Sequence, residues 1–193
     1  KWSSIQKDMM EYDVTMPYIR MMAGPVDYTP GAMRNASKKD FKDIYYNPMS
    51  QGTRCHQLAA YVVHDSPLTM LADNPTIYKR EQECTDFIIS IPNKGIEETR
   101  VLQGKVGESI IMARRAGTSW YIGGMTDWTA REITLDFDFL DNGNYEVILF
   151  KDGINADKQA EDYKQEQFTI TPASKKKIRM ASGGGFAMTI TKK

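Results

Sequence analysis

Four carboxylates near the start of the chain flank an apolar run and could carry chemistry. Asp8, Glu11 and Asp13 precede the run VTMPYIRMMAG, residues 14–24, and Asp27 follows it. Carboxylates that lie close together can divide the work of a general acid and a general base between them. Their chemistry therefore depends on where the apolar run ends and what surrounds that end.

Residues 14–24 predict a buried strand, because the run is short and almost wholly apolar. Pro17 is compatible with the edge or the beginning of a strand. The run ends in GPVDYTPG, whose glycines and prolines predict an abrupt turn. In that turn Asp27 could hold backbone amides or contact a ligand. Tyr28 could wall a ligand pocket, or bury its ring and form a hydrogen bond through its hydroxyl.

From Thr53 the pattern becomes helical, with Thr53 as a candidate N-cap. Apolar residues then recur at steps of three and four, which places them on one helix face. Ser66 and Asn74 are each followed by proline, which predicts two further helix starts. The apolar positions of the first helix are Cys55, Leu58, Ala59, Val62 and Val63.

After residue 96 the pattern changes to short runs of alternating, β-branched or aromatic residues. Turn sequences such as AGT, DNGN, TPAS and SGGG separate the runs. About seven short strands at this spacing predict an antiparallel β-sandwich. The chain is therefore expected to divide into residues 1–96 and 97–193. The predicted strands are 109–115, 119–125, 132–140, 145–150, 167–171, 176–181 and 186–191.

Composition excludes several classes of protein. The 25 Lys and Arg residues balance the 25 Asp and Glu residues, so nucleic acid is not an expected partner. No apolar run approaches the roughly 18 residues that predict a membrane span. Cys55 and Cys84 are expected to be buried thiols rather than a disulfide. The chain begins KWSSIQKD, without an initiator Met, so we expect it to be processed or truncated.

The histidines are not expected to carry chemistry. Cys55 and His56 are neighbours on the predicted helix, so their side chains diverge by about 100° and cannot form a catalytic dyad. His56 is expected to be a hydrogen-bonded, partly buried residue. His64 is expected to be a cation that favours the helix C-terminus.

The architecture of the first half is incomplete. A buried strand at 14–24 needs neighbours on both edges, and residues 1–96 contain no clear partner strand. The terminal strand and helices of a (β/α)8 barrel, followed by a C-terminal antiparallel β-sandwich domain, account for every segment. In such barrels the loops after the strands carry the active site. The upstream part of the same polypeptide would supply the remaining barrel.

Long stretches of the sequence resemble one family. MPYIRMMAGPVDYTPGAMRN, GTRCHQLAAYVVHDSPLTMLADNP, WYIGGMTDW and YEVILFKDGINADKQAEDY closely resemble the C-terminal part of glycoside hydrolase family 97. The resemblance covers almost the whole chain in order. It implies a calcium-dependent enzyme that cleaves α-galactosides or α-glucosides in the bacterial periplasm. It also implies an N-terminal β-sandwich, a central (β/α)8 barrel and a small C-terminal β-domain.

The resemblance bears on Glu11 more than on the other acidic residues. Family members carry a carboxylate just before the matching segment, so Glu11 is a candidate catalytic residue and calcium ligand; the alternative is a solvated loop residue. Asp27 and Tyr28 are the candidate substrate-binding residues. Calcium takes six to eight oxygen ligands, which requires carboxylates beyond this chain.

Within the family, EYDVTMPYIRMMAGPVDYTPGAMRNA is closer to the retaining α-galactosidase branch than to the inverting α-glucosidase branch. A different alternative is a non-catalytic carbohydrate-binding module. Its binding platform would be formed by Trp120, Tyr121 and Trp128, which could equally lie in a core or a domain interface.

Overall fold

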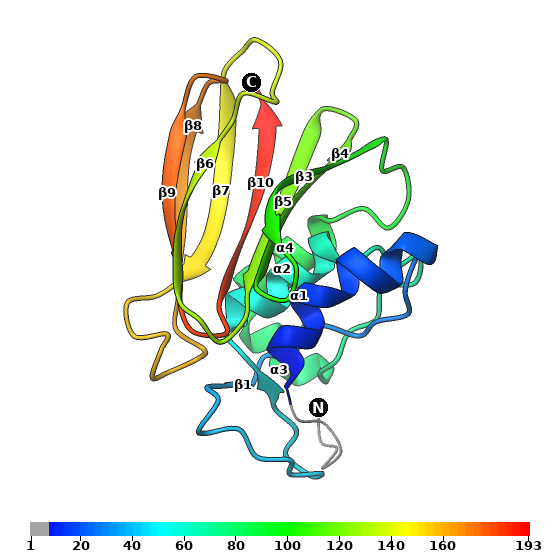
Figure 1. Ribbon diagram of the computed structural model, residues 1–193, viewed down its shortest axis with the longest axis vertical. Helices are drawn as coiled ribbons and strands as arrows, with labels where there is room; N and C mark the ends of the chain where they lie inside the picture. Colours follow the sequence, from blue (N-terminus) through cyan, green and yellow to red (C-terminus); the bar gives the residue numbers. More distant parts are fainter. Residues whose placement is uncertain (1–7) are drawn as a thin grey trace.

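The computed structural model describes residues 8–193 and is dominated by antiparallel β-structure (Figure 1). Six strands form one sheet in the order β3-β4-β5-β10-β7-β8, with every neighbouring pair antiparallel. The central position of β10 means that the last strand of the chain joins the two halves of the sheet. The six strands are β3 (Glu98–Lys105), β4 (Ser109–Ala116), β5 (Ser119–Thr126), β7 (Tyr145–Asp152), β8 (Tyr163–Ile170) and β10 (Gly185–Lys192).

A second, two-stranded sheet covers one face of the large sheet. It consists of β6 (Arg131–Asp136) and β9 (Lys175–Met180), paired antiparallel. Leu135 and Ile178 from this ribbon pack with Ile122, Val147 and Met188 of the large sheet in one buried core. The antiparallel β-domain predicted from the alternating runs is therefore confirmed, as a sandwich of unequal sheets.

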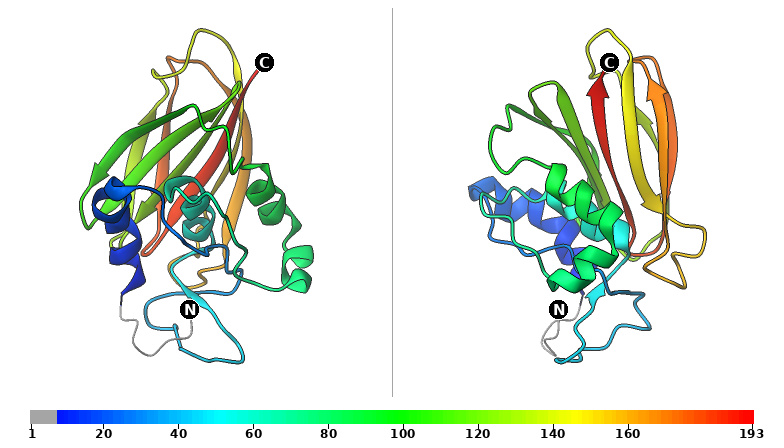
Figure 2. Two further views of the ribbon diagram at one scale, coloured as in Figure 1. Left: turned by 90° about the vertical axis from the view of Figure 1, so that its right-hand side faces the viewer. Right: turned by 180° about the vertical axis from the view of Figure 1, so that it is seen from behind.

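The helices pack on the opposite face of the large sheet (Figure 2). All ten residues of α2 (Arg54–Val63) are buried, and α2 contacts β4, β5, β7 and β10. Thr53 is its N-cap, as predicted, and its Oγ1 accepts a hydrogen bond from the His56 amide at 3.2 Å. The remaining elements are α1 (Met9–Ile19), the 3-10 turn η1 (Arg20–Ala23), α3 (Pro75–Arg80), α4 (Gln82–Ser90) and the short parallel pair β1 (Asn35–Ala36) and β2 (Ser50–Gln51).

The prediction of a strand at 14–24 is wrong, because residues 9–19 form α1 and residues 20–23 form η1. Asp8 caps the helix by accepting a hydrogen bond from the Glu11 amide. Met10, Asp13 and Val14 are buried, at the three- and four-residue spacing of a helix face. This spacing is visible only when the polar residues before the apolar run are included.

The predicted helix after Ser66 does not form. Leu68 and Leu71 are 65% and 49% exposed, so this segment has no packed face to stabilise a short helix. The helix after Asn74 does form, and the Asn74 side chain accepts a hydrogen bond from the Ile77 amide at 3.1 Å.

Strand β3 was missed because most of its side chains are exposed and show no apolar alternation. Cys55 and Cys84 are free and buried, as predicted. No helix within residues 8–193 combines the length and the apolar character that crossing a membrane requires.

Asp152, at the end of β7, joins the helices to both sheets. Its buried carboxylate accepts hydrogen bonds from Thr53 Oγ1 at 2.6 Å, the Ala181 amide at 2.8 Å and the Gly185 amide at 2.9 Å. Burial raises the pKa of Asp152 from 3.8 to about 6, although these donors act in the opposite direction. The folded protein therefore binds a proton at Asp152 more readily than the unfolded chain does.

This pKa predicts a specific pH dependence of stability. Between about pH 4 and pH 6 the folded state should bind more protons at Asp152 than the unfolded state, so its contribution to stability should fall as pH rises and then stay constant. Asp152→Asn does not titrate, so urea unfolding should show the wild-type protein losing stability relative to this variant over that window. Asp138→Asn changes an exposed aspartate and is the matched control. If the free energies of unfolding of the wild type and Asp152→Asn change in parallel with pH, the raised pKa of Asp152 is contradicted.

Candidate functional site

Helix α1 carries Asp13 into the interior, where it meets two residues from distant segments. Asp13 is 1% exposed. Its Oδ1 accepts a hydrogen bond from the Tyr28 hydroxyl at 2.6 Å, and its Oδ2 lies 3.3 Å from His56 Nε2. Burial, followed by the neighbouring Asp13 carboxylate, raises the pKa of Tyr28 well above its usual range. Tyr28 therefore keeps its proton and acts as a donor.

The His56 ring has an acceptor at each nitrogen. Its Nδ1 lies 3.2 Å from the Gly184 carbonyl oxygen, which can only accept, so Nδ1 carries a proton. The contact between Nε2 and Asp13 Oδ2 must then contain a second proton, on either the imidazole or the carboxyl. In both forms the His56–Asp13 pair has a net charge of zero. This neutrality explains how both side chains can be fully buried.

The backbone of α1 provides a third contact to this network. Pro17 lies inside the helix and has no N–H group, so the carbonyl of Asp13, four residues earlier, has no helical donor. His64 Nε2 donates to this carbonyl at 3.2 Å. The His64 ring also contacts the Tyr28 ring edge-on, with centroids 4.5 Å apart. We refer to Asp13, Tyr28, His56 and His64 as the Asp13 network.

His64 does not act as a helix C-terminal cation, so this prediction is wrong. It is 3% exposed, and burial lowers the pKa of its imidazole despite the nearby Asp13. A neutral ring with the proton on Nε2 fits its single hydrogen bond to a carbonyl. His56 is hydrogen-bonded, as predicted, but is fully rather than partly buried.

Two members of the Asp13 network, Asp13 and Tyr28, line a cavity of about 160 Å³, which we call the α1 cavity. Gln51 and Gln57 hold its other walls: Gln51 Oε1 accepts from the Met9 amide, and Gln57 Oε1 accepts from the Gly31 amide, both at 3.1 Å. Carboxylate, hydroxyl and amide groups thus line a hollow that also has an apolar side, as small polar ligands require. Its lining residues are Met9, Met10, Asp13, Tyr28, Thr29, Phe41, Ser50, Gln51 and Gln57.

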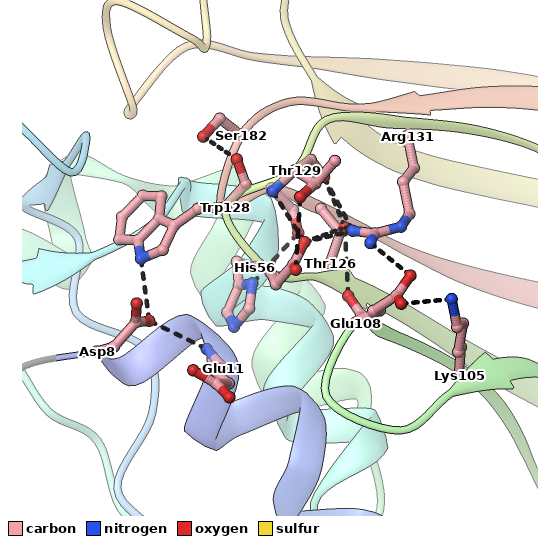
Figure 3. Close-up of polar contacts among 12 residues, drawn as sticks. Asp8, Glu11, His56, Lys105, Glu108, Thr126, Trp128, Thr129, Arg131 and Ser182 are labelled. Carbon is pink, nitrogen blue, oxygen red and sulfur yellow. Dashed lines mark hydrogen bonds and ion pairs between the residues drawn. The ribbon is translucent and has the colours of Figure 1, made fainter.

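The predicted site residues occupy three different environments. Tyr28 lines the α1 cavity and donates to Asp13. Glu11 is exposed in the first turn of α1, beside Asp8 (Figure 3). Asp27 is exposed, and within residues 8–193 its carboxylate accepts no hydrogen bond. The structure therefore brings Tyr28 to the cavity, while Glu11 and Asp27 face outward.

Sequence reasoning missed Asp13, His56 and His64 as one unit. Once α1 is recognised as a helix, Pro17 indicates that the Asp13 carbonyl needs an outside donor. Which side chain provides that donor depends on tertiary structure alone.

The described residues do not form a calcium site by themselves. Within residues 8–193 no three acidic, histidine or cysteine residues are grouped so that they could hold a metal ion. Asp8 already accepts two hydrogen bonds and lies 3.6 Å from Lys38. Among the carboxylates at the start of α1, Glu11 is the exposed one that could contribute to a site completed by other residues.

Comparison with known proteins decides the family. Residues 95–191 match the family model described as "Glycosyl-hydrolase 97 C-terminal, oligomerisation". The chain belongs to glycoside hydrolase family 97. A protein of Bacteroides thetaiotaomicron named retaining alpha-galactosidase is 54% identical over 190 residues, which cover 98% of this chain and 28% of that protein.

Two further relatives differ more in sequence. A probable retaining alpha-galactosidase of Streptomyces bingchenggensis is 28% identical over 139 residues, 72% of this chain and 20% of that protein. A family 97 enzyme from Pseudoalteromonas sp. strain K8, solved in complex with acarbose, superimposes with a TM-score of 0.83 at 32% identity. This superposition covers 95% of the chain and 28% of the solved one. The chain thus spans less than a third of the length of these relatives.

The Asp13 network predicts the effect of removing one hydroxyl. Tyr28→Phe leaves Asp13 Oδ1 buried without its donor, so the free energy of unfolding should fall by about 1–3 kcal/mol. Tyr121→Phe is the control, because the Tyr121 hydroxyl makes no hydrogen bond within residues 8–193. Chemical denaturation of both variants measures the difference. If Tyr28→Phe and Tyr121→Phe lose the same free energy of unfolding, the hydrogen bond from the Tyr28 hydroxyl to Asp13 does not stabilise the fold.

Proposed function

We propose that this chain is the C-terminal portion of a calcium-dependent glycoside hydrolase that cleaves terminal α-galactosides with retention. The observation that carries the proposal is the 54% identity, over almost the whole chain, to a protein named retaining alpha-galactosidase. On this proposal the substrate is an α-linked oligosaccharide, and most catalytic groups lie in other parts of the polypeptide.

In the proposed enzyme, residues 1–96 complete a (β/α)8 barrel and residues 97–193 form its C-terminal domain. The segment after Gly24 supports this arrangement. Val26 is buried, Asp27 is exposed and Tyr28 turns back toward Asp13, which is the alternation of an extended chain. If this segment is the last barrel strand, Asp27 faces the barrel interior as a substrate contact. Tyr28 then faces the helices and supports the wall of the site.

Glu11 is the proposed contribution of α1 to the calcium site or to acid–base catalysis. Its carboxylate is exposed in the first turn, where the helix backbone leaves amides that favour negative charge. Retaining glycosidases need two carboxyl groups roughly 5 Å apart, so a catalytic partner of Glu11 would come from another part of the polypeptide.

The main alternative is an inverting α-glucosidase. The relative from Pseudoalteromonas sp. strain K8 has been solved with acarbose and, as a single-residue variant, with panose. Its 32% identity supports this alternative less strongly than the 54% identity supports the α-galactosidase.

A carbohydrate-binding module is disfavoured, because Trp120 is 6% exposed and packs against Phe139. It therefore offers no open platform for a sugar. We further propose a periplasmic location, which rests on the family resemblance alone.

The whole protein should hydrolyse p-nitrophenyl α-galactoside at least tenfold faster than the α-glucoside, measured as kcat/KM. Proton NMR of the first-formed product should show the α-anomer, as retention requires. Preference for the α-glucoside with a β-anomeric product would establish the inverting alternative. Specific glycan binding by a protein without hydrolysis would establish the binding-module alternative.

Glu11→Gln in the same protein should lower kcat/KM by about 100-fold or weaken calcium binding by about 10-fold or more, because a charged oxygen ligand or acid is lost. Enzyme kinetics and calorimetric calcium titration measure the two effects separately. Glu132→Gln, on the exposed face of β6, is the control. If both quantities are unchanged, Glu11 is only a solvated residue of the first helical turn.

A further inference from the structure

The side chain of Trp128 connects the β-domain to the start of α1. Trp128 lies in the turn between β5 and β6, and its Nε1–H donates to Asp8 Oδ1 at 3.0 Å (Figure 3). The same oxygen of Asp8 accepts the Glu11 amide at 3.2 Å. One carboxylate oxygen therefore caps α1 and accepts the tryptophan. The position of the first helical turn depends on a residue 120 positions away in the sequence.

The turn that carries Trp128 is held on several sides. Ser182 Oγ donates to the Trp128 carbonyl at 2.6 Å, and the Gly183 amide donates to the Asp127 carbonyl at 2.8 Å. The indole ring lies directly on Gly183, where an added Cβ would come within 2.5 Å of the ring. This close approach fixes the plane of the ring and therefore the direction of its N–H group.

Charged groups behind the turn add to its rigidity. Arg131 donates to Asp127 within the turn. It also donates to Glu108 at 3.0 Å (Figure 3). Asp127 Oδ1 also accepts the Thr129 amide at 2.8 Å. Although burial acts in the opposite direction, these donors lower the pKa of Asp127, so it stays ionised and paired. The donor that reaches Asp8 thus projects from a rigid support.

The first turn of α1 forms part of the candidate site. Met9 and Met10 line the α1 cavity, and Glu11 extends from the same turn. Lys38 adds an exposed contact, with its ammonium 3.6 Å from Asp8 and 5.7 Å from the centre of the Trp128 ring. An exposed ion pair of this kind contributes little energy. The hydrogen bond from the fixed indole is the directional contact.

We propose that Trp128 is a positioning residue of the enzyme: through Asp8 it fixes the first turn of α1, and thereby Glu11 and the Met9–Met10 wall of the α1 cavity. The inference rests on the proposed function only for its effect on catalysis. It gives the C-terminal domain a defined part in the site, although Trp128 itself touches no substrate.

The test uses the whole protein with Trp128→Phe, which keeps a ring over Gly183 and removes the N–H donor. Hydrogen exchange of the amides at the start of α1 should accelerate about fivefold, because the cap is weakened. A displaced first turn should lower kcat about tenfold and change KM less than twofold, since small displacements of reacting groups act on the chemical step. Trp120→Phe is the matched control: it is the same change in the β-core, with its partner Phe139 outside α1.

Variants of Asp8 test the same hydrogen bond by changing its acceptor instead of its donor. Asp8→Asn keeps the oxygen that accepts both hydrogen bonds and should retain most of the activity and protection. Asp8→Ala removes the acceptor and should reproduce the effect of Trp128→Phe. The double variant Trp128→Phe with Asp8→Ala should have the same kcat and the same amide exchange as Asp8→Ala alone. Both substitutions remove the same hydrogen bond, so the second has nothing further to remove.

Two results would overturn the proposal. Unchanged exchange at the start of α1 in folded Trp128→Phe would show that the contact does not hold the helix. Faster exchange with unchanged kcat would show a purely structural contact. If Trp128→Phe does not fold, the comparison of Asp8→Asn with Asp8→Ala decides in the same way. A wild-type protein without α-glycosidase activity would refute the proposed function, and the exchange measurements would still decide whether Trp128 positions α1.

Discussion

The structure depends on how closely helix α2 approaches the six-stranded sheet. A Cβ at Gly123 would lie 2.7 Å from the Ala59 carbonyl oxygen, and one at Gly185 would lie 3.0 Å from the His56 Cα. Only glycine permits this distance on β5 and β10. As a consequence every residue of α2 is buried, and apolar residues of the first half pack with Phe150, Met125 and Ala187 of the sheet in shared cores.

Polar groups that are buried at this interface lose their contacts with solvent, so most of them form hydrogen bonds within the protein. Asp152 does so by accepting from the N-cap residue of α2 and from the β9–β10 turn. His56, three residues after Thr53, contacts the Gly184 carbonyl oxygen with one ring nitrogen and the Asp13 carboxylate with the other. The position of α1 thus follows from the position of α2, because the neutral Asp13–His56 pair can persist in the interior only when both partners are present.

The sequence predicted the elements whose pattern is local. Thr53 and Asn74 were identified as N-caps because a capping side chain acts within three residues. The strands with a buried face, such as β5 and β7, were found through their alternation. The failures have a common cause. Helix α1 takes its buried face partly from Asp13, a residue whose burial depends on His56 and Tyr28, and β3 is an edge strand with few buried side chains.

The candidate site was predictable only in part for the same reason. Tyr28 could be selected from its place after the apolar run, but its partner Asp13 is recognised only after the helix is known. Trp128 belonged to an aromatic cluster in the sequence, and nothing local distinguishes a tryptophan that donates across an interface from one that fills a core, as Trp120 does.

Helix α1 is held at three points by the β-domain and α2, although it precedes both in the chain. Asp8 accepts from Trp128 at its start, Asp13 contacts α2 at its middle, and the Tyr18 hydroxyl donates to the Ser109 carbonyl at 2.9 Å near its end. Glycine again permits one of these contacts, because a Cβ at Gly104 would overlap the Tyr18 hydroxyl. Meanwhile Glu11, Tyr12 and Ile19 on the outer side are exposed. A helix fixed at three points on its inner side can present its outer side, including Glu11, in one orientation.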